Sequence, residues 1–186
     1  MPKSAAPRRY IAFLRAINVG GHTVKMDRLR ALFEALGFGG VTTFIASGNV
    51  VFETAEADEG ALEKKIERHL RESLGYDVAT FLRTVDEVAA AAVYAPFPDA
   101  DLDGATLYVL FLKSEPGAEA RKKVEALATD ADSFHLHGRE LYWLARKKMG
   151  ESAISGAVLE KALGMPGTMR NANTVRRMAE RLGGAA

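Results

Sequence analysis

The segment that most constrains the fold is residues 10–17, YIAFLRAI, in which almost every residue is apolar. A strand with one face in water alternates apolar and polar residues, whereas a strand buried on both faces is nearly continuously apolar. Residues 10–17 therefore predict a central strand in a sheet that is covered on both sides.

The segments that follow this strand alternate between helical and extended patterns. Apolar residues at helical spacing predict helices at residues 26–36 and 58–74, and β-branched or aromatic runs predict strands at residues 41–46, 50–52 and 77–84. Asp58 is suited to cap the second helix, and Gly75 is suited to end it. Gly48-Asn49 predicts a two-residue hairpin turn between the strands at 41–46 and 50–52.

The resulting order, β-α-β-β-α-β, is that of a ferredoxin-like lobe. The usual strand order of this pattern is 4-1-3-2 with antiparallel neighbours, so the first and third strands are adjacent. The first and second strands then point the same way, and the end of the first strand shares one sheet edge with the hairpin tip. We therefore expect residues 18–25 to lie beside residues 47–49.

A second lobe follows a turn-rich, acidic connector. The domain organisation predicted is a ferredoxin-like lobe at residues 8–94, a linker at 95–104, and an α+β lobe with C-terminal helices at 105–183. In the second lobe we expect strands at residues 106–112, 133–137 and 140–144, and helices at 118–128, 158–163 and 173–182. This order is partly ferredoxin-like, but no clear internal repeat is visible. Each sheet needs a cover on its helix-free face, which packing of the two lobes or a homodimer would provide.

The two loops at the predicted sheet edge, Asn18-Val19-Gly20-Gly21 and Ala46-Ser47-Gly48-Asn49, form a candidate site. Glycine-rich loops expose backbone N–H groups that can hold a phosphate or carboxylate, and nearby Arg and Lys side chains would add positive charge. Before the last helix, an Asn cap and a guanidinium would also favour an anion. The candidate ligand-binding residues are Arg15, Asn18, Gly20, Gly21, Lys25, Ser47, Gly48, Asn49, Arg170 and Asn171. For either loop taken alone, a tight turn is the better explanation, and only the predicted adjacency of the two loops makes a binding site an equal alternative.

No catalytic signature is found in the chain. The glycine spacing fits neither a P-loop nor a dinucleotide-binding loop, and cysteine is absent, which excludes disulfides and thiolate catalysis. His135 and His137 alternate along one strand with Glu140 opposite, but a solvent-facing polar row explains them better than a metal site. We therefore expect neither a metal nor a cofactor.

Composition and charge indicate a soluble, cytoplasmic globular protein. With 48% hydrophobic and 26% charged residues, the chain has no apolar run long enough to span a membrane and no signal-peptide pattern. The net charge of +1 is distributed unevenly, because both ends are basic and residues 27–138 are acidic. A basic region would suit a small anionic ligand or nucleic acid, although basic residues on helix surfaces explain the same pattern.

The same segments resemble the bacterial family called domain of unknown function 1697. The resemblance is carried by residues 13–21, Lys25-Met26, 36–38, 47–52 and Arg170-Asn171 with Thr174, and it spans about residues 9–182. Ala16 stands where the family usually has glycine, and Met169 and Ala172 replace a threonine and a tryptophan. The resemblance implies a two-lobed α+β fold built on ferredoxin-like units, and it implies no activity.

Three functions stay open at this point. The favoured one is a small-ligand protein, with enzyme activity left open, whose site combines the first-lobe loops with Arg170 and Asn171. The second is a structural or interaction module in which the loops serve only folding. The third and least favoured is RNA binding on an open sheet, with Tyr10 and Phe52 as the candidate stacking residues.

Overall fold

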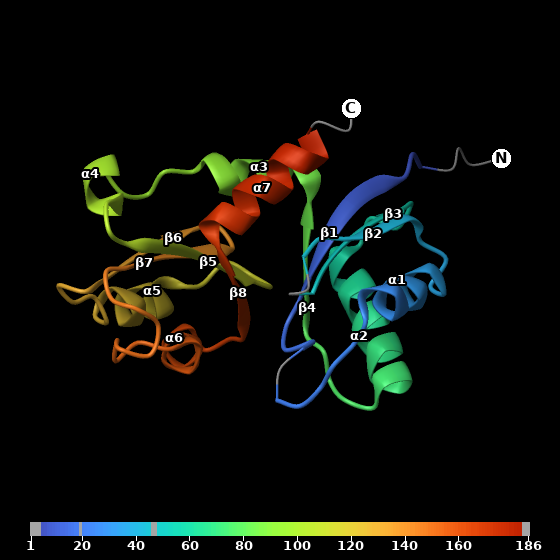
Figure 1. The fold of residues 1–186 in the computed structure, drawn as a ribbon, viewed down its shortest axis with the longest axis horizontal. Helices are drawn as coiled ribbons and strands as arrows, with labels where there is room; N and C mark the ends of the chain where they lie inside the picture. The colour runs from blue at the N-terminus through green and yellow to red at the C-terminus, as the bar shows by residue number, and fades with distance from the viewer. Residues whose placement is uncertain (1–4, 19, 46–47, 184–186) are drawn as a thin grey trace. The chain divides into compact units, whose positions relative to one another are not determined.

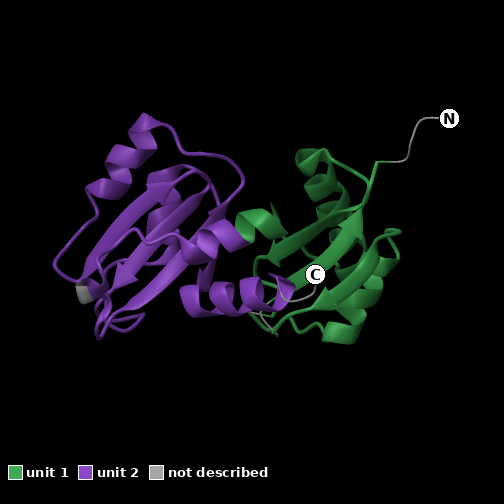
Figure 2. Ribbon diagram, turned by 90° about the horizontal axis from the view of Figure 1, so that it is seen from above, with its two compact units in different colours: residues 1–88 green, residues 89–186 purple. Residues whose placement is uncertain are grey.

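The protein is described from a computed structural model that covers residues 5–18, 20–45 and 48–183 (Figure 1). The chain divides into two compact units, residues 1–88 and 89–186, which are coloured separately in Figure 2. Each unit contains one four-stranded antiparallel sheet, so the expected α+β class with two lobes is confirmed.

Unit 1 has the predicted element order. Its sheet has the strand order β2-β3-β1-β4, and every neighbouring pair is antiparallel, as expected from the pattern. Both α1 and α2 lie on one side of this sheet (Figure 1). The elements are β1 (Arg8–Leu14), α1 (Met26–Glu34), β2 (Gly39–Thr43), β3 (Asn49–Thr54), α2 (Glu59–Leu74), β4 (Thr80–Thr84) and α3 (Val85–Val93), the last of which continues into unit 2.

Strand β1 is buried on both faces, as its composition predicts. Tyr10, Ala12 and Leu14 belong to the core under α1 and α2, whereas Ile11 and Phe13 lie on the opposite face and are equally buried. The strand ends at Leu14 rather than at residue 17, because the chain turns away from the sheet there.

The predicted ends of α2 are also confirmed. The Asp58 carboxylate accepts a hydrogen bond of 3.0 Å from the Ala61 N–H, and Gly75 closes the helix with a left-handed φ of +84°. Because the helix ends at Gly75, the chain is free to return to the sheet as β4.

The expected two-residue hairpin at Gly48-Asn49 is wrong. Strand β2 ends at Thr43 and β3 begins at Asn49, so the connection comprises residues 44–48 and Asn49 is a strand residue. The Phe44 N–H donates to the Asn49 carbonyl oxygen at 2.9 Å, which closes a longer loop than the one predicted.

Unit 2 contains one strand that the sequence patterns did not predict. Residues 167–171, for which no helix or strand was predicted, form β8, which pairs with β5 along its length. The strand order is β6-β7-β5-β8. The elements are α4 (Asp99–Leu102), β5 (Thr106–Leu112), α5 (Ala118–Glu125), β6 (Asp132–His137), β7 (Glu140–Ala145), α6 (Gly156–Leu163), β8 (Gly167–Asn171) and α7 (Ala172–Gly183).

The two sheets therefore repeat one topology, a repeat that the sequence analysis missed. Strands β1 and β5 occupy equivalent places and share the pattern Tyr-x-x-Phe-Leu, at residues 10–14 and 108–112. In each unit the tyrosine pairs with an aromatic residue on the neighbouring strand, Tyr10 with Phe52 and Tyr108 with Trp143. The repeat provides an internal comparison for every loop of the fold.

Candidate functional site

The two loops predicted to be adjacent in unit 1 do lie together. Phe13 is in register with Asn49, and the Leu14 N–H donates to the Gly48 carbonyl oxygen at 2.8 Å. Residues 15–25 therefore leave the sheet beside residues 44–48, and we refer to these two segments as the paired loops. Val19, Ala46 and Ser47, three residues of the predicted site motifs, lie outside the described residues.

The two asparagines of the predicted site are used to build the paired loops. The Asn18 side-chain oxygen accepts a hydrogen bond of 2.7 Å from the Val24 N–H and so closes the first loop. Asn49 is 0% exposed, and its side-chain amino group donates to the Phe44 carbonyl oxygen at 2.9 Å across the second loop. Both side chains therefore position backbone, and the buried Asn49 cannot contact a ligand from solvent.

Gly48 is required by close packing where the loops meet. Its φ is +80°, and a Cβ atom at this position would lie 2.6 Å from Ile17 Cγ2 and 3.3 Å from the Leu14 carbonyl oxygen. In contrast, Gly20 and Gly21, with φ of +62° and +84°, are exposed and have open space around them. Gly48 thus holds the loops together, while Gly20 and Gly21 leave their backbone accessible.

Backbone strain is concentrated in the paired loops. Ala16 and Ile45, with φ of +59° and +58°, are the non-glycine residues that adopt positive φ within the described part of the chain. A β-branched residue such as isoleucine is a genuine outlier in this conformation, and Ile45 is also 43% exposed. Such strain persists only where the surrounding structure imposes it, and it is found most often at functional sites.

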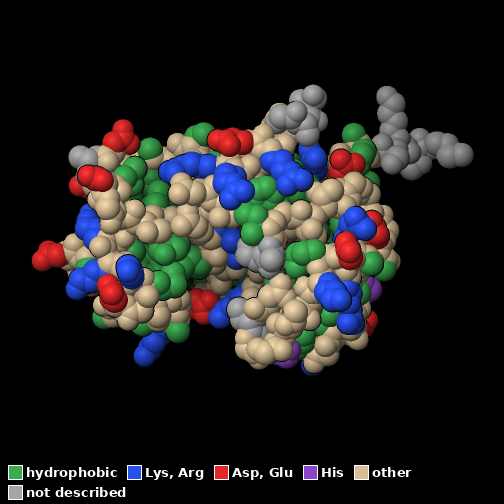
Figure 3. All heavy atoms as spheres, in the orientation of Figure 1, with side chains coloured by type: hydrophobic (Ala, Val, Ile, Leu, Met, Phe, Trp, Pro, Cys, Tyr) green, Lys and Arg blue, Asp and Glu red, His purple; other side chains and the backbone are tan. Residues whose placement is uncertain are grey.

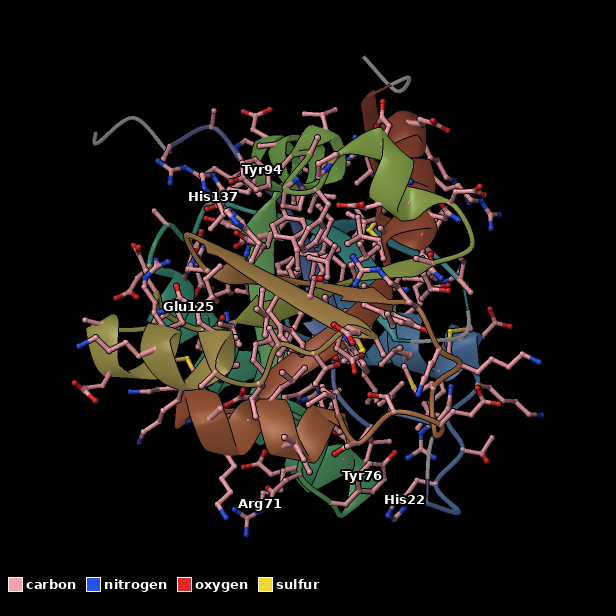
Figure 4. The ribbon with its side chains drawn as sticks, turned by 90° about the vertical axis from the view of Figure 1, so that its left-hand side faces the viewer. His22, Arg71, Tyr76, Tyr94, Glu125 and His137 are labelled. Carbon is pink, nitrogen blue, oxygen red and sulfur yellow. The ribbon has the colours of Figure 1, made fainter. Side chains whose placement is uncertain are left out.

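Tyr76 supports the first loop, a role that the sequence analysis did not identify. Its hydroxyl donates to the Ile17 carbonyl oxygen at 3.2 Å, and its ring stacks on His22 with the centroids 3.9 Å apart. Figure 4 shows His22 and Tyr76 lying side by side. The signal in the sequence was weak, because Tyr76 is a single aromatic residue just after the Gly75 helix stop.

The charged groups of the paired loops are all basic. Arg15 is half-buried just after β1, and its backbone N–H donates to the Ala79 carbonyl oxygen at 2.9 Å. Lys25 is exposed at the N-cap position of α1. Residues 15–25 and 44–48 contain no Asp or Glu, and the nearest acid along the chain is Asp27 in the first turn of α1.

The remaining two predicted residues, Arg170 and Asn171, belong to unit 2, so their contribution to the paired loops stays a prediction. Arg170 was expected next to a helix terminus, but it lies within β8 and is only 8% exposed. Its guanidinium donates to Thr168 Oγ1 and to the Met169 carbonyl oxygen, both at 2.8 Å, and burial lowers the pKa of Arg170 to about 10. Arg83 occupies the equivalent place in β4 and is fully buried. A buried arginine at the same position of both sheets indicates that Arg83 and Arg170 each help to build the repeated fold.

Of the two asparagines that could cap the last helix, Asn171 and Asn173, Asn171 provides the cap. Its side-chain oxygen accepts a hydrogen bond of 2.9 Å from the Asn173 N–H, at the start of α7. This residue is half-buried and lines a cavity in unit 2.

His135 and His137 both contact Tyr94; His137 is exposed, as a solvent-facing row requires, whereas His135 is half-buried. The Tyr94 hydroxyl lies 2.7 Å from His135 Nε2, and the Tyr94 ring stacks on His137 with the centroids 4.0 Å apart. Tyr94 and His137 are labelled in Figure 4, where they lie side by side. Glu140 is opposite His137 across the hairpin, as predicted. Over the described residues, no group of three His, Cys, Asp or Glu side chains is placed to hold a metal ion.

The aromatic residues proposed for RNA stacking are inaccessible. Tyr10 and Phe52 are both fully buried in the core beneath α1 and α2. A base can stack only on an exposed ring, so this version of the RNA-binding hypothesis is wrong.

The sequence that builds this fold, including the motifs of the paired loops, matches a known protein family. The family described as "Protein of unknown function (DUF1697)" matches residues 8–142. The chain belongs to this family. No curated protein matches the chain. Among the helices of the described ranges, none is long and apolar enough to cross a membrane.

The fold of this family member is similar to that of a solved structure. The solved structure is that of the conserved bacterial protein SP0830 from Streptococcus pneumoniae, which is 23% identical to this chain with a TM-score of 0.72. The match covers 96% of this chain and 99% of the other. At this level of identity the similarity establishes the shared fold alone.

Proposed function

We propose that the protein binds a small phosphate- or carboxylate-bearing ligand at the paired loops of unit 1. The observation that carries the proposal is the strain at Ala16 and Ile45, which lie in the two loops that meet at one sheet edge. Strained backbone without a compensating role in folding points to a function for the segment that contains it.

The repeat in unit 2 supports the view that folding does not require these loops. The equivalent connection after β5 comprises only residues 113–117, and the equivalent hairpin between β6 and β7 is closed by Gly138-Arg139. The same backbone hydrogen bond joins the two segments there, from the Leu112 N–H to the Arg139 carbonyl oxygen at 2.9 Å. Residues 15–25 and 44–48 are thus longer and more strained than this topology needs.

The charges of the paired loops favour an anionic ligand. Arg15 and Lys25 are basic, and residues 15–25 and 44–48 contain no Asp or Glu that would repel an anion. The exposed Gly20 and Gly21 add backbone that a ligand can approach closely. In this proposal Arg15 and Lys25 bind the anion, Gly20 and Gly21 offer N–H groups, and Asn18, Gly48 and Asn49 hold the loops in place.

A thermal-shift screen against nucleotides, sugar phosphates and organic acids tests the proposal, because a ligand that binds only the native state raises the melting temperature. We expect at least one phosphate or carboxylate compound to raise it. We further expect the shift to be lost in Arg15→Gln, because a charge-assisted hydrogen bond to an anion is worth about 1.5–3 kcal/mol.

Lys113→Gln is the matched control, since Lys113 follows β5 as Arg15 follows β1. It removes one positive charge at the equivalent point of unit 2 and should leave the shift intact. If no anion stabilises the protein, or if the shift survives Arg15→Gln, the paired loops do not bind an anion. The alternative of a structural or interaction module would then be favoured.

A further inference from the structure

Unit 2 contains two adjoining cavities that have no role in the proposed function. Their volumes are about 370 Å³ and about 280 Å³, and Leu102, Leu107 and Arg176 line both of them. All of their lining residues belong to unit 2. The volume of the larger cavity is within the range of small-molecule sites, and the smaller cavity adjoins it at Arg176.

The larger cavity is predominantly apolar. Its walls are formed by the end of α3, the segment after it, α4 and α7, with Tyr94, Phe97, Leu102 and Leu107 among the lining side chains. Val93, another lining residue, is 81% exposed, more than the other large apolar residues found exposed in the described chain. Val93 adds exposed apolar surface to the lining of the apolar cavity, and a partly apolar ligand would cover it.

The distribution of charge differs between the two cavities. Asp99, Glu180 and Arg176 line the larger cavity, whereas Arg176 is the one charged residue among the residues that line the smaller cavity. A negatively charged group is therefore repelled by carboxylates in the larger cavity and meets only a guanidinium in the smaller one. Figure 3 shows basic side chains gathered where α7 lies, and α7 carries exposed Arg176, Arg177 and Arg181.

The polar side chains of the smaller cavity are arranged as donors. Asn171 accepts from the Asn173 N–H, and Asn173 accepts from Arg176 Nη1, both at 2.9 Å. The side-chain oxygens are engaged within the protein, and each asparagine also carries an amino group with two N–H donors, the chemistry that suits an anionic ligand. The bond to Asn173 also orients the Arg176 guanidinium, which reduces the entropy lost on binding.

We propose that these cavities form a binding site for a small amphipathic carboxylate, with its apolar body in the larger cavity and its carboxylate beside Arg176, Asn171 and Asn173. This site is independent of the paired loops, which lie in unit 1. An apolar body of about the size of a phenyl ring with a short alkyl chain can be accommodated in a cavity of about 370 Å³ and serves as the probe.

Isothermal titration calorimetry with 4-phenylbutyrate and its neutral amide, 4-phenylbutyramide, tests the proposal on the full-length protein. The two probes share the apolar body and differ only in charge. We expect the carboxylate to bind about tenfold more tightly than the amide, and we expect Arg176→Gln to abolish that preference while the amide still binds.

Arg177→Gln is the matched control, because it removes the same charge from the next position of α7 and lines neither cavity. It should keep the wild-type preference for the carboxylate. Phe97→Ala should weaken both probes, because it removes part of the apolar wall. The proposal is overturned if neither probe binds the wild-type protein, if both bind equally, or if the two arginine variants lose the preference to the same extent. Retention of the thermal shift from the paired loops in Arg176→Gln would separate the two sites.

Discussion

Ala16 is an exposed residue with a φ of +59°, a conformation that costs an L-residue roughly 1–2 kcal/mol and glycine almost nothing. We expect Ala16→Gly to raise the free energy of unfolding by about 0.5–1 kcal/mol, because relief of strain exceeds the greater chain entropy of glycine. Urea unfolding measures this difference. Ala35→Gly is the control, since Ala35 has a φ of −63° at the end of α1, and it should instead destabilise the protein.

The positive φ of Ala16 agrees with what the family resemblance implies for this position. The resemblance described above implies a glycine where this chain has Ala16, and a left-handed backbone is what such a glycine would permit. The neighbouring Gly48 could be anticipated as a turn residue, but its actual constraint could not. That constraint is the 2.6 Å approach that a Cβ would make to Ile17, a contact between segments far apart in sequence.

At the scale of elements, the first of the paired loops depends on Tyr76, which enters it from the end of α2. We expect Tyr76→Phe to lower the free energy of unfolding by about 0.5–1.5 kcal/mol, through loss of the hydrogen bond to the Ile17 carbonyl oxygen. Tyr76→Ala should cost more, because it also removes the stacking on His22.

Hydrogen exchange locates this effect. Amide exchange in residues 20–25 should accelerate in Tyr76→Ala, while residues 113–117, the equivalent connection in unit 2, should exchange as in the wild type. Equal protection of residues 20–25 in the wild type and in Tyr76→Ala would mean that the first loop is held by other contacts.

Elements with local signals were predicted well, and elements without them were not. The α2 boundaries follow from Asp58 and Gly75, which act on their own helix. Strand β8 has the sequence GTMRN, with a glycine and an arginine where an apolar run is expected. It forms because Gly167 packs flat against Leu110 and Leu112, where a Cβ would lie 2.8–2.9 Å from their side chains. Propensity is outweighed there by packing against β5.

At the scale of the whole molecule, a net charge of +1 and burial of the sheet aromatics oppose nucleic-acid binding. We expect any binding of single-stranded RNA at low salt to disappear at about 0.15 M salt, because phosphate contacts alone weaken steeply with salt. Fluorescence anisotropy with labelled oligouridylate measures this. Binding that persists at that salt concentration would show that rings other than Tyr10 and Phe52 stack on the bases.

The repeat is also a property of the whole molecule. Little of the repeat is visible in the sequence, because equivalent positions need to pack alike but need not share the same residue. Tyr10 and Tyr108 each pair with an aromatic residue on the neighbouring strand, and Arg83 and Arg170 are each buried. The repeat identifies residues 15–25 and 44–48 as additions to a fold that unit 2 completes without them.

The amino-acid sequence by itself determined the α+β class, the strand order of unit 1, the burial of β1 on both faces and the meeting of the paired loops, because periodicity and helix-stop signals act within a few residues. The tertiary structure alone decided that Asn18 and Asn49 hold the loops, that Tyr76 supports them, that Arg170 is buried in β8, and that two cavities meet at Arg176. Each of these depends on contacts between segments distant along the chain, which no local pattern records.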